Sequence, residues 1–448
     1  MRLRTPLSAG RATSRVAAPA ALVAALVLAA PPSSSLAPPA AQAAKSTAKK
    51  KPKRTVEGEL TRLRRAGSIT LADRRAWRAT YRQARAAVRS LPKRSTAARE
   101  LQGVLDNTED MARRGRISAS LAPSVFLTLQ VNRDWWTSRP IPVAGSRPTV
   151  PGSPLVWQYY VGEGLQIQWL GTFGLANALG TTTNPEKLAQ QQAIGDEALR
   201  LASSRAGGPS WQYLFDFGGG APPWGSGMAQ ITGMQALTRL AGRTGQAGHR
   251  TTALRAVSLV RRAPTSGARY KRPAGDHILL YTFTRMRVLN AFAQSVSGLR
   301  EVALSTGDAK VGAAYVRAER ELRAELPAYD TGRWTRYSLG GANATVSYHV
   351  LSRDLVRGLC KALEADAVAF AAGQPVPAGV APPPAAPYCA AAERYTAYLQ
   401  RTPNGPGAKA RSRAAGGAAT APPPREEPTV GLADGLLQPG PGESPADR

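Results

Sequence analysis

Cysteine and histidine are both scarce in this chain of 448 residues, which holds two cysteines and three histidines. Two cysteines exclude a disulfide-dense scaffold and a structural zinc cluster. The histidines (His249, His277 and His349) lie far apart, and neither an HExxH pair nor a GxSxG turn occurs. These absences argue against metal-dependent and serine hydrolases, so we expect no metal site and no cofactor.

Acidic residues are also few, because Asp and Glu number 29 against 59 Lys and Arg, for a net charge of +30. This excess favours a polyanionic partner such as nucleic acid, anionic lipid or an acidic polysaccharide, although an arginine-rich compositional bias would produce it as well. No zinc finger, helix-turn-helix or aromatic RNA-binding strand accompanies the arginines, so we expect no specific nucleic-acid recognition.

Long apolar runs are missing too. Residues 1–43 resemble an export signal, with a basic start, an apolar stretch at 17–30 and small residues at Ala41-Gln42-Ala43. The apolar stretch is too short and too interrupted by proline for a spanning helix, although a retained anchor is an alternative. The sequence therefore predicts a secreted, extracellular protein whose mature chain has no transmembrane helix.

The rest of the chain divides by composition. A basic stretch at 44–54 precedes a basic helical region at 55–137, with helices expected around 71–88, at 96–114 and at 118–132. This region either packs on the main domain or forms a polyanion-binding arm. A proline-rich linker at 138–154 leads to the main domain at 155–402, and a tail rich in Pro, Gly and Ala at 403–448 cannot fold.

Helical periodicity dominates the main domain, without convincing strands apart from a short hairpin at 210–218. Repeated helical hairpins predict an all-α fold, an α/α toroid or incomplete α/α barrel with a helical N-terminal lead-in. Such a ring leaves a concave face that suits a sugar. The expected helices span 185–205, 226–244, 250–262, 286–306, 308–325, 345–370 and 388–401.

Tyrosines are the best candidates for chemistry. Residues 326–349 (LPAYDTGRWTRYSLGGANATVSYH) include Tyr337 and Tyr348, and Tyr281 precedes a predicted helix. Inverting the carbon next to a uronate carboxylate requires a base on one face of the ring and an acid on the other. Nearby cations would favour phenolate, and an arginine would hold the carboxylate as its charge grows. The alternative is that these tyrosines pack between helices. Candidate arginines are Arg285, Arg287, Arg333, Arg336 and Arg353.

Other loop residues are also candidates for contact with a sugar. Gln168 and Trp169 follow two glycines and could meet a sugar through an amide and a stacking plane. A pair of acidic residues of the glycosidase type remains an alternative, although each candidate is more typical of a cap or a turn. These candidates are Glu163, Asp216, Asp276 and Asp330.

Three blocks of the main domain resemble the D-glucuronyl C5-epimerase family. They are PWGSGMAQ at 223–230, Tyr281 with RVLNAF at 287–292, and 326–349. The resemblance implies an all-α catalytic domain, acting without a cofactor, whose catalytic tyrosines are Tyr281, Tyr337 and Tyr348. Gly340 stands where the family has an arginine, and Leu280 where it has an acidic residue. Substrate-binding candidates are Trp224, Arg287, Asn290, Arg336 and His349, together with Gln168 and Trp169.

The implied function is conversion of glucuronate to iduronate residues in a uronate-containing polysaccharide, the expected partner. A polysaccharide lyase and a non-catalytic carbohydrate- or cell-wall-binding protein are the alternatives, and a homodimer is left open. Because Cys360 and Cys389 are the only thiols of an exported chain and flank a proline-rich loop between two predicted helices, we expect a disulfide between them rather than two free thiols.

Overall fold

The computed structural model describes residues 54–406, all within the second of the two units into which the chain divides. The expected export signal at 1–43, nearly all of the basic stretch at 44–54 and the tail beyond 406 lie outside the described residues. Across residues 54–406, every helix is too short or too polar to span a bilayer.

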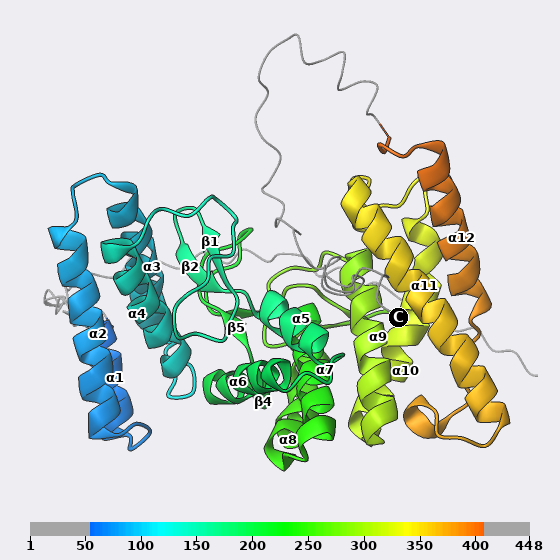
Figure 1. Cartoon of the computed structure of the whole chain (residues 1–448), viewed down its shortest axis with the longest axis horizontal. Helices are drawn as coiled ribbons and strands as arrows, with labels where there is room; N and C mark the ends of the chain where they lie inside the picture. The colour runs from blue at the N-terminus through cyan, green and yellow to red at the C-terminus, as the bar shows by residue number, and fades with distance from the viewer. Residues whose placement is uncertain (1–53, 407–448) are drawn as a thin grey trace, which may run out of the picture. The chain divides into compact units, whose positions relative to one another are not determined.

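Four helices form the N-terminal region (Figure 1). Thr55, Thr70 and Ser95 each cap a helix by accepting a backbone N–H, and Thr70 forms a capping box with Asp73. The fourth helix begins at Ala122, not at the expected 118, because Pro123 suits the first turn of a helix. The helices are α1 (Val56–Arg65), α2 (Leu71–Ser90), α3 (Thr96–Arg113) and α4 (Ala122–Ser138).

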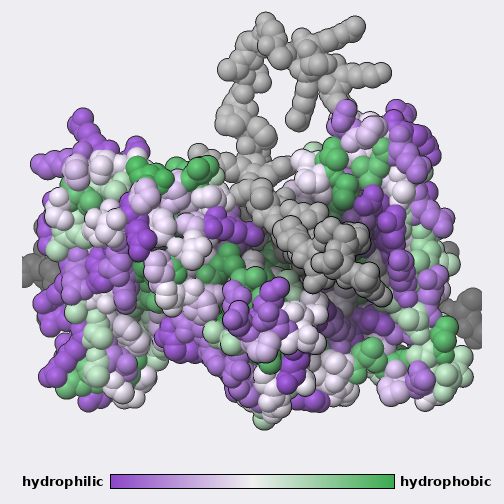
Figure 2. All heavy atoms as spheres, in the orientation of Figure 1, coloured by the Kyte–Doolittle hydropathy of each residue, from purple (hydrophilic) through white to green (hydrophobic). Residues whose placement is uncertain are grey.

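Most arginines of this region are exposed, while its aromatic residues face the neighbouring helices. Trp77 of α2 stacks on Phe126 of α4 with ring centroids 5.4 Å apart. Figure 2 shows hydrophilic residues over much of the visible surface of these helices. Residues 139–156 carry no helix or strand, as a proline-rich segment should.

Eight further helices form four consecutive pairs. The first members, α5, α7, α9 and α11, pack against one another in chain order, and each also packs against the helix that follows it. This is the arrangement of helical hairpins in an incomplete α/α barrel, and it confirms the all-α prediction. The pairs are α5 (Trp169–Leu179) with α6 (Pro185–Leu201), α7 (Gly227–Thr244) with α8 (Ala247–Ala256), α9 (Leu289–Thr306) with α10 (Ala309–Glu325), and α11 (Val346–Ala371) with α12 (Ala386–Arg401).

Burial separates inner from outer helices. Every residue from Gly227 to Leu237 in α7 and from Leu289 to Val296 in α9 is buried, so the N-terminal halves of both helices are enclosed on all sides. Outer helix α10 buries a single stripe instead, which includes Val311, Tyr315 and Ala318. Because the inner helices begin in the most enclosed part of the domain, the loops before them are held firmly.

The expectation of no convincing strands was wrong. Four two-stranded antiparallel ribbons lie among the described residues, each too short to produce a visible alternation in the sequence. The hairpin expected at 210–218 is only partly present, because its strand pairs with a segment beyond it. The ribbons are β1 (Trp157–Tyr160) with β2 (Gly164–Ile167), β3 (Ser203–Arg205) with β4 (Gly208–Ser210), β5 (Gln212–Tyr213) with β6 (Trp224–Gly225), and β7 (Arg269–Lys271) with β8 (Asp276–Ile278).

The two cysteines meet across the last helical pair. Cys360 of α11 and Cys389 of α12 form a disulfide with an S–S distance of 2.16 Å and a Cα–Cα distance of 4.9 Å. Their Cα separation is ordinary for a disulfide. The bond ties together the two helices that flank the proline-rich loop, as the sequence predicts.

Candidate functional site

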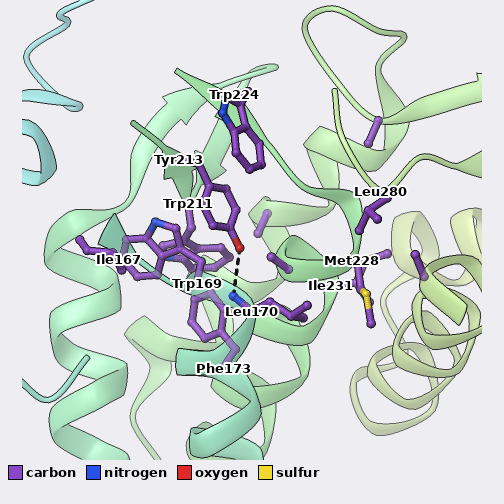
Figure 3. Close-up of a cluster of buried hydrophobic side chains, with 14 of the residues drawn as sticks. Ile167, Trp169, Leu170, Phe173, Trp211, Tyr213, Trp224, Met228, Ile231 and Leu280 are labelled. Atoms are coloured by element: carbon purple, nitrogen blue, oxygen red, sulfur yellow. Dashed lines mark hydrogen bonds between the residues drawn. The ribbon is translucent and has the colours of Figure 1, made fainter. Parts of the chain in front are cut away.

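Backbone pairing brings the starts of the inner helices together. Ser226, the N-cap of α7, forms an isolated bridge with Tyr281, and Gly227 N donates to Leu280 O at 3.1 Å. The first and second blocks of the sequence pattern are therefore neighbours in space, although about fifty residues separate them in the chain. Leu280 itself is buried and points its side chain toward Met228 (Figure 3).

The second block is joined to the third in the same way. Val288 bridges Ser338, Leu289 N donates to Tyr337 O at 3.1 Å, and Leu339 N donates to Arg287 O at 3.0 Å. The start of α9 is thus fixed to the loop that carries Tyr337. Together these bridges place all three blocks around the N-termini of α7, α9 and α11.

Tyr337 and Tyr348 contact each other directly. Their rings meet edge to face, with centroids 4.8 Å apart and planes at 61°. Tyr348 lies in the first turn of α11 and is buried, while Tyr337 is half-buried. Ala344 and Leu351 pack beside them as a small apolar cluster. The structure therefore gathers two of the three candidate tyrosines at one point.

Tyr281 belongs to a different surface, which we call the aromatic wall. Its ring stacks on Phe283 at 5.3 Å, and it meets Phe217 edge-on at 5.6 Å. The aromatic wall comprises Tyr160, Phe215, Phe217, Tyr281 and Phe283, and Tyr160 continues it through contacts with Phe215 at 4.5 Å and Phe217 at 6.4 Å. Phe215 is buried behind the other four rings, which are half-buried and are therefore suited to stacking on sugars.

Arg287 is held by a buried acidic residue that the sequence analysis did not single out. Glu325 Oε1 accepts from Arg287 Nη1 at 3.0 Å, while Glu325 Oε2 accepts from Tyr329 at 3.2 Å and lies 2.9 Å from His277 Nδ1. Burial opposes ionisation, yet the hydrogen bonds from His277 and Arg287 keep the pKa of Glu325 below its usual value. Burial also lowers the pKa of His277, which favours the neutral form of this imidazole. The four-residue spacing between Glu325 and Tyr329, typical of neighbours on one helical face, was the sequence signal that could have pointed to this cluster.

Arg336 lies on the loop itself, where its Nη1 donates to Gly341 O at 3.3 Å. Gly340, the position of the family arginine, has φ of 78° in the left-handed region. A Cβ there would contact nothing within 4 Å, so the space beside the loop is open. Arg336 and Arg287 thus remain the candidate carboxylate-binding cations near the two tyrosines.

His349 is a structural residue, and its assignment to substrate binding was wrong. Its ring is fully buried and stacks on Trp334 at 3.8 Å. Thr335 N donates to Nδ1 at 3.3 Å, and Nε2 lies 2.9 Å from Tyr395 O, where it donates. Burial lowers the pKa of this imidazole, so it is neutral and fixes the loop to α12.

Four other proposed sugar ligands are buried, and three of them need the same correction. Trp169 and Trp224 are each 1% exposed, and their Nε1 groups donate to Gln212 O and Phe215 O, so neither ring can stack on a ligand. Gln168 is the N-cap of α5, and its Oε1 accepts from Leu170 N. Asn290 is buried as well, yet its Oδ1 has no hydrogen-bond partner among the described residues, so its role stays a prediction.

Figure 3 shows why the two tryptophans are enclosed. Trp169, Trp211 and Phe173 pack together, and the hydroxyl of Tyr213 points at the start of α5, where Leu170 N donates to it at 3.2 Å. Trp224 stacks on the Tyr213 ring with centroids 4.3 Å apart. These side chains therefore pack in the core beneath the loops and do not form a binding face.

The loop acidic residues have separate roles. Asp276 pairs with Arg317 at 2.8 Å, and Asp330 pairs with Arg394 at 2.8 Å. Glu163 differs, because burial raises its pKa to about 6, Asn107 Nδ2 donates to it at 2.6 Å and the charge of Asp216 lies nearby. Glu163 sits in the β1–β2 turn beside Tyr160, at the far end of the aromatic wall.

Metal-ligand geometry occurs at one place among the described residues, where Cys360, Glu364 and Cys389 place their ligand atoms within 4.8 Å of one another. The two sulfur atoms are bonded to each other there, so they supply no thiolate. The group is a disulfide beside a glutamate and not a candidate metal centre.

Comparisons with known proteins identify a family for part of the chain. Two similar solved structures are the endo-beta-1,4-glucanase CMCax from Acetobacter xylinum (10% identity, TM-score 0.34, covering 56% of this chain and 93% of that one) and a novel alpha-amylase from Clostridium perfringens (13%, 0.30, 53% and 75%). Among curated protein sequences, none matches this chain. Residues 208–372 match the family described as D-glucuronyl C5-epimerase C-terminus, and this segment holds Tyr281, Tyr337 and Tyr348. Through residues 208–372, the chain belongs to the D-glucuronyl C5-epimerase C-terminal domain family.

Proposed function

We propose that the protein is an exported isomerase that converts glucuronate to iduronate residues within a uronate-containing polysaccharide. Membership of the family supports a carbohydrate-modifying, epimerase-like role. The observation that carries the finer proposal is the contact of Tyr337 with Tyr348 at the entrance of α11, on a loop bridged to the start of α9.

The proposed reaction moves one proton off C5 of the sugar and another onto its opposite face. A tyrosine oxygen takes the C5 proton, the C5–H bonding electrons spread into the adjacent carboxylate, and a second tyrosine delivers its hydroxyl proton from the other side. Because the rings of Tyr337 and Tyr348 touch, a sugar cannot sit between them. We therefore assign that pair to one face of the sugar and Tyr281 of the aromatic wall to the other.

The negative charge that grows on the carboxylate needs stabilisation. Arg287 and Arg336 flank the Tyr337 loop, and the N-termini of α7, α9 and α11 add the positive ends of three helix dipoles. Asn290 supplies a buried acceptor, Oδ1, for a sugar hydroxyl. The acidic residue of the family before Tyr281 is absent, since Leu280 fills the core at that position.

The test is incubation of the full secreted chain in deuterated water with polymers of glucuronate, mannuronate and galacturonate. We expect deuterium at C5 and iduronate residues in the glucuronate polymer, without unsaturated chain ends. Unsaturated ends would show that the carbanion expels the C4 substituent, which is lyase chemistry. The absence of both deuterium and unsaturated ends on every polymer would leave a carbohydrate-binding protein.

A further inference from the structure

A charged hollow lies between outer helices α8 and α10, and none of Tyr281, Tyr337 and Tyr348 lines it. It has a volume of about 910 Å³ and is bounded by the β3–β4 turn, the end of α8, the β7–β8 ribbon and the start of α10. Seven cationic side chains line it. Arg317 pairs with Asp276, and the other six are Arg255, Arg261, Arg262, Arg269, Lys271 and Lys310. We call this feature the cationic groove.

The acidic residues of the cationic groove are already engaged. Asp276 binds Arg317 at 2.8 Å, and Asp308 caps α10 by accepting from Lys310 N and Val311 N at 2.9 Å each. Neither carboxylate is therefore available to neutralise the six cations. Within residues 54–406, no carboxylate oxygen lies within 4.0 Å of any of their charged nitrogens.

The side chains that line the cationic groove favour binding of an anion. Arg269 is half-buried, and its Nε is a buried donor with no hydrogen-bond partner among the described residues. A buried donor without a partner costs free energy, and an anionic acceptor from outside would remove that cost. The other five cations are exposed, so they attract an anion while they stay hydrated.

We propose that the cationic groove binds a stretch of acidic polysaccharide outside the tyrosine site. The groove volume falls in the range of ligand sites, and no aromatic side chain lines it. Sites for single-stranded nucleic acid combine a positively charged groove with aromatic rings on which the bases stack, so a lining without aromatic rings favours a polysaccharide. This choice of partner rests on the proposed function.

The groove and the tyrosine site share one segment of chain. Asp276 lies on β8 (Asp276–Ile278), and Tyr281 follows three residues after that strand ends. A polymer held along the groove would be tethered close to the wall that carries Tyr281, which raises the local concentration of uronate units there.

The experiment measures binding directly, so that it does not depend on catalysis. Immobilised heparosan, an unsulfated glucuronate polymer, is titrated with wild-type full chain and with the triple variant Arg261→Ala, Arg262→Ala, Lys271→Ala. The control triple variant is Arg64→Ala, Arg75→Ala, Arg89→Ala, which removes the same charge from exposed, unbridged positions of α1 and α2. A variant with Arg261→Lys and Arg262→Lys keeps the charge, and Tyr348→Phe reports on the tyrosine site.

At physiological salt, we expect the groove triple variant to bind heparosan about tenfold more weakly than the wild type. The affinity of the control triple variant should fall by less than about twofold. The lysine variant should bind as the wild type does, whereas Tyr348→Phe should lose exchange and keep most of its heparosan binding. Equal losses in the two triple variants would overturn the proposal in favour of general attraction. If the groove triple variant loses affinity equally for heparosan and for double-stranded DNA of matched charge, the choice of polysaccharide is overturned.

Discussion

The ring of Tyr337 meets the ring of Tyr348 edge to face, 4.8 Å between centroids, across two segments that the sequence separates by ten residues. The loop between them is closed by Trp334, whose Nε1 donates to Ala344 O at 2.8 Å, and by His349 beneath it. The histidine and tryptophan of this stretch thus support the loop that carries the two tyrosines.

Loss of the Glu325 charge should release Arg287 and destabilise the domain. Glu325→Gln keeps the shape of the side chain but removes its ion pair with Arg287 at a buried position. We expect the free energy of unfolding to fall by about 2–3 kcal/mol. Chemical denaturation measures this. The matched control is Glu197→Gln, whose partner Arg200 is exposed and which should cost less than about 1 kcal/mol. Equal costs for the two variants would contradict a structural role for the Glu325–Arg287 pair.

The raised pKa of Glu163 makes a prediction about pH. Burial lifts this pKa from 4.5 to about 6 in the folded chain, so the folded state holds the proton more tightly than the unfolded state does. The group therefore stabilises the fold below pH 4.5, and this contribution is lost as pH rises from 4.5 through 6. Because the carboxyl is partly exposed, we expect a change of about 1 kcal/mol.

The check compares wild type with Glu163→Gln by denaturation at several pH values. The stability difference between the two proteins should change between pH 4.5 and 6 and stay constant above about pH 7. A difference independent of pH would show that Glu163 has an ordinary pKa. Glu393→Gln, at an exposed position of α12 without an ion pair among the described residues, serves as the control for the general effect of pH.

Much of the helical fold was predictable because its helices start and stop at residues with a local preference. Asp308 accepts two N–H groups at the start of α10, while Gly245 and Gly307 end α7 and α9 with φ of 72° and 66°. Helix α5 was missed because it is buried nearly all round, so its sequence lacks the polar face that produces a helical period.

The candidate site was only partly predictable, because the sequence does not say which way a polar residue points. Gln168 and His349 looked like ligands of a sugar, yet one caps a helix and the other is enclosed by Trp334 and Tyr395. Glu325 was missed for the same reason, since two of its three partners, His277 and Arg287, come from distant parts of the chain. The tyrosines were found through a shared sequence pattern and not through local physics.

The disulfide should contribute directly to stability. Cys360 and Cys389 are 29 residues apart, and closing a loop of this size stabilises a fold by about 3–4 kcal/mol in the chain-entropy model. We expect the variant Cys360→Ser, Cys389→Ser to unfold at a correspondingly lower denaturant concentration. Thiol titration of the unfolded, unreduced secreted protein should find no free thiol, whereas two titratable thiols would contradict the bond.

The most direct test of the tyrosine mechanism measures deuterium incorporation at C5 of a glucuronate polymer by Tyr281→Phe, Tyr337→Phe and Tyr348→Phe. Each change keeps the ring and should cost the fold only about 1 kcal/mol. Tyr388→Phe is the control, because Tyr388 is buried against Glu319, remote from the three sequence blocks. We expect exchange to fall about 100-fold or more when the base or the acid is removed, and to stay near the wild-type rate in Tyr388→Phe. Wild-type rates of exchange in all three tyrosine variants would contradict the account.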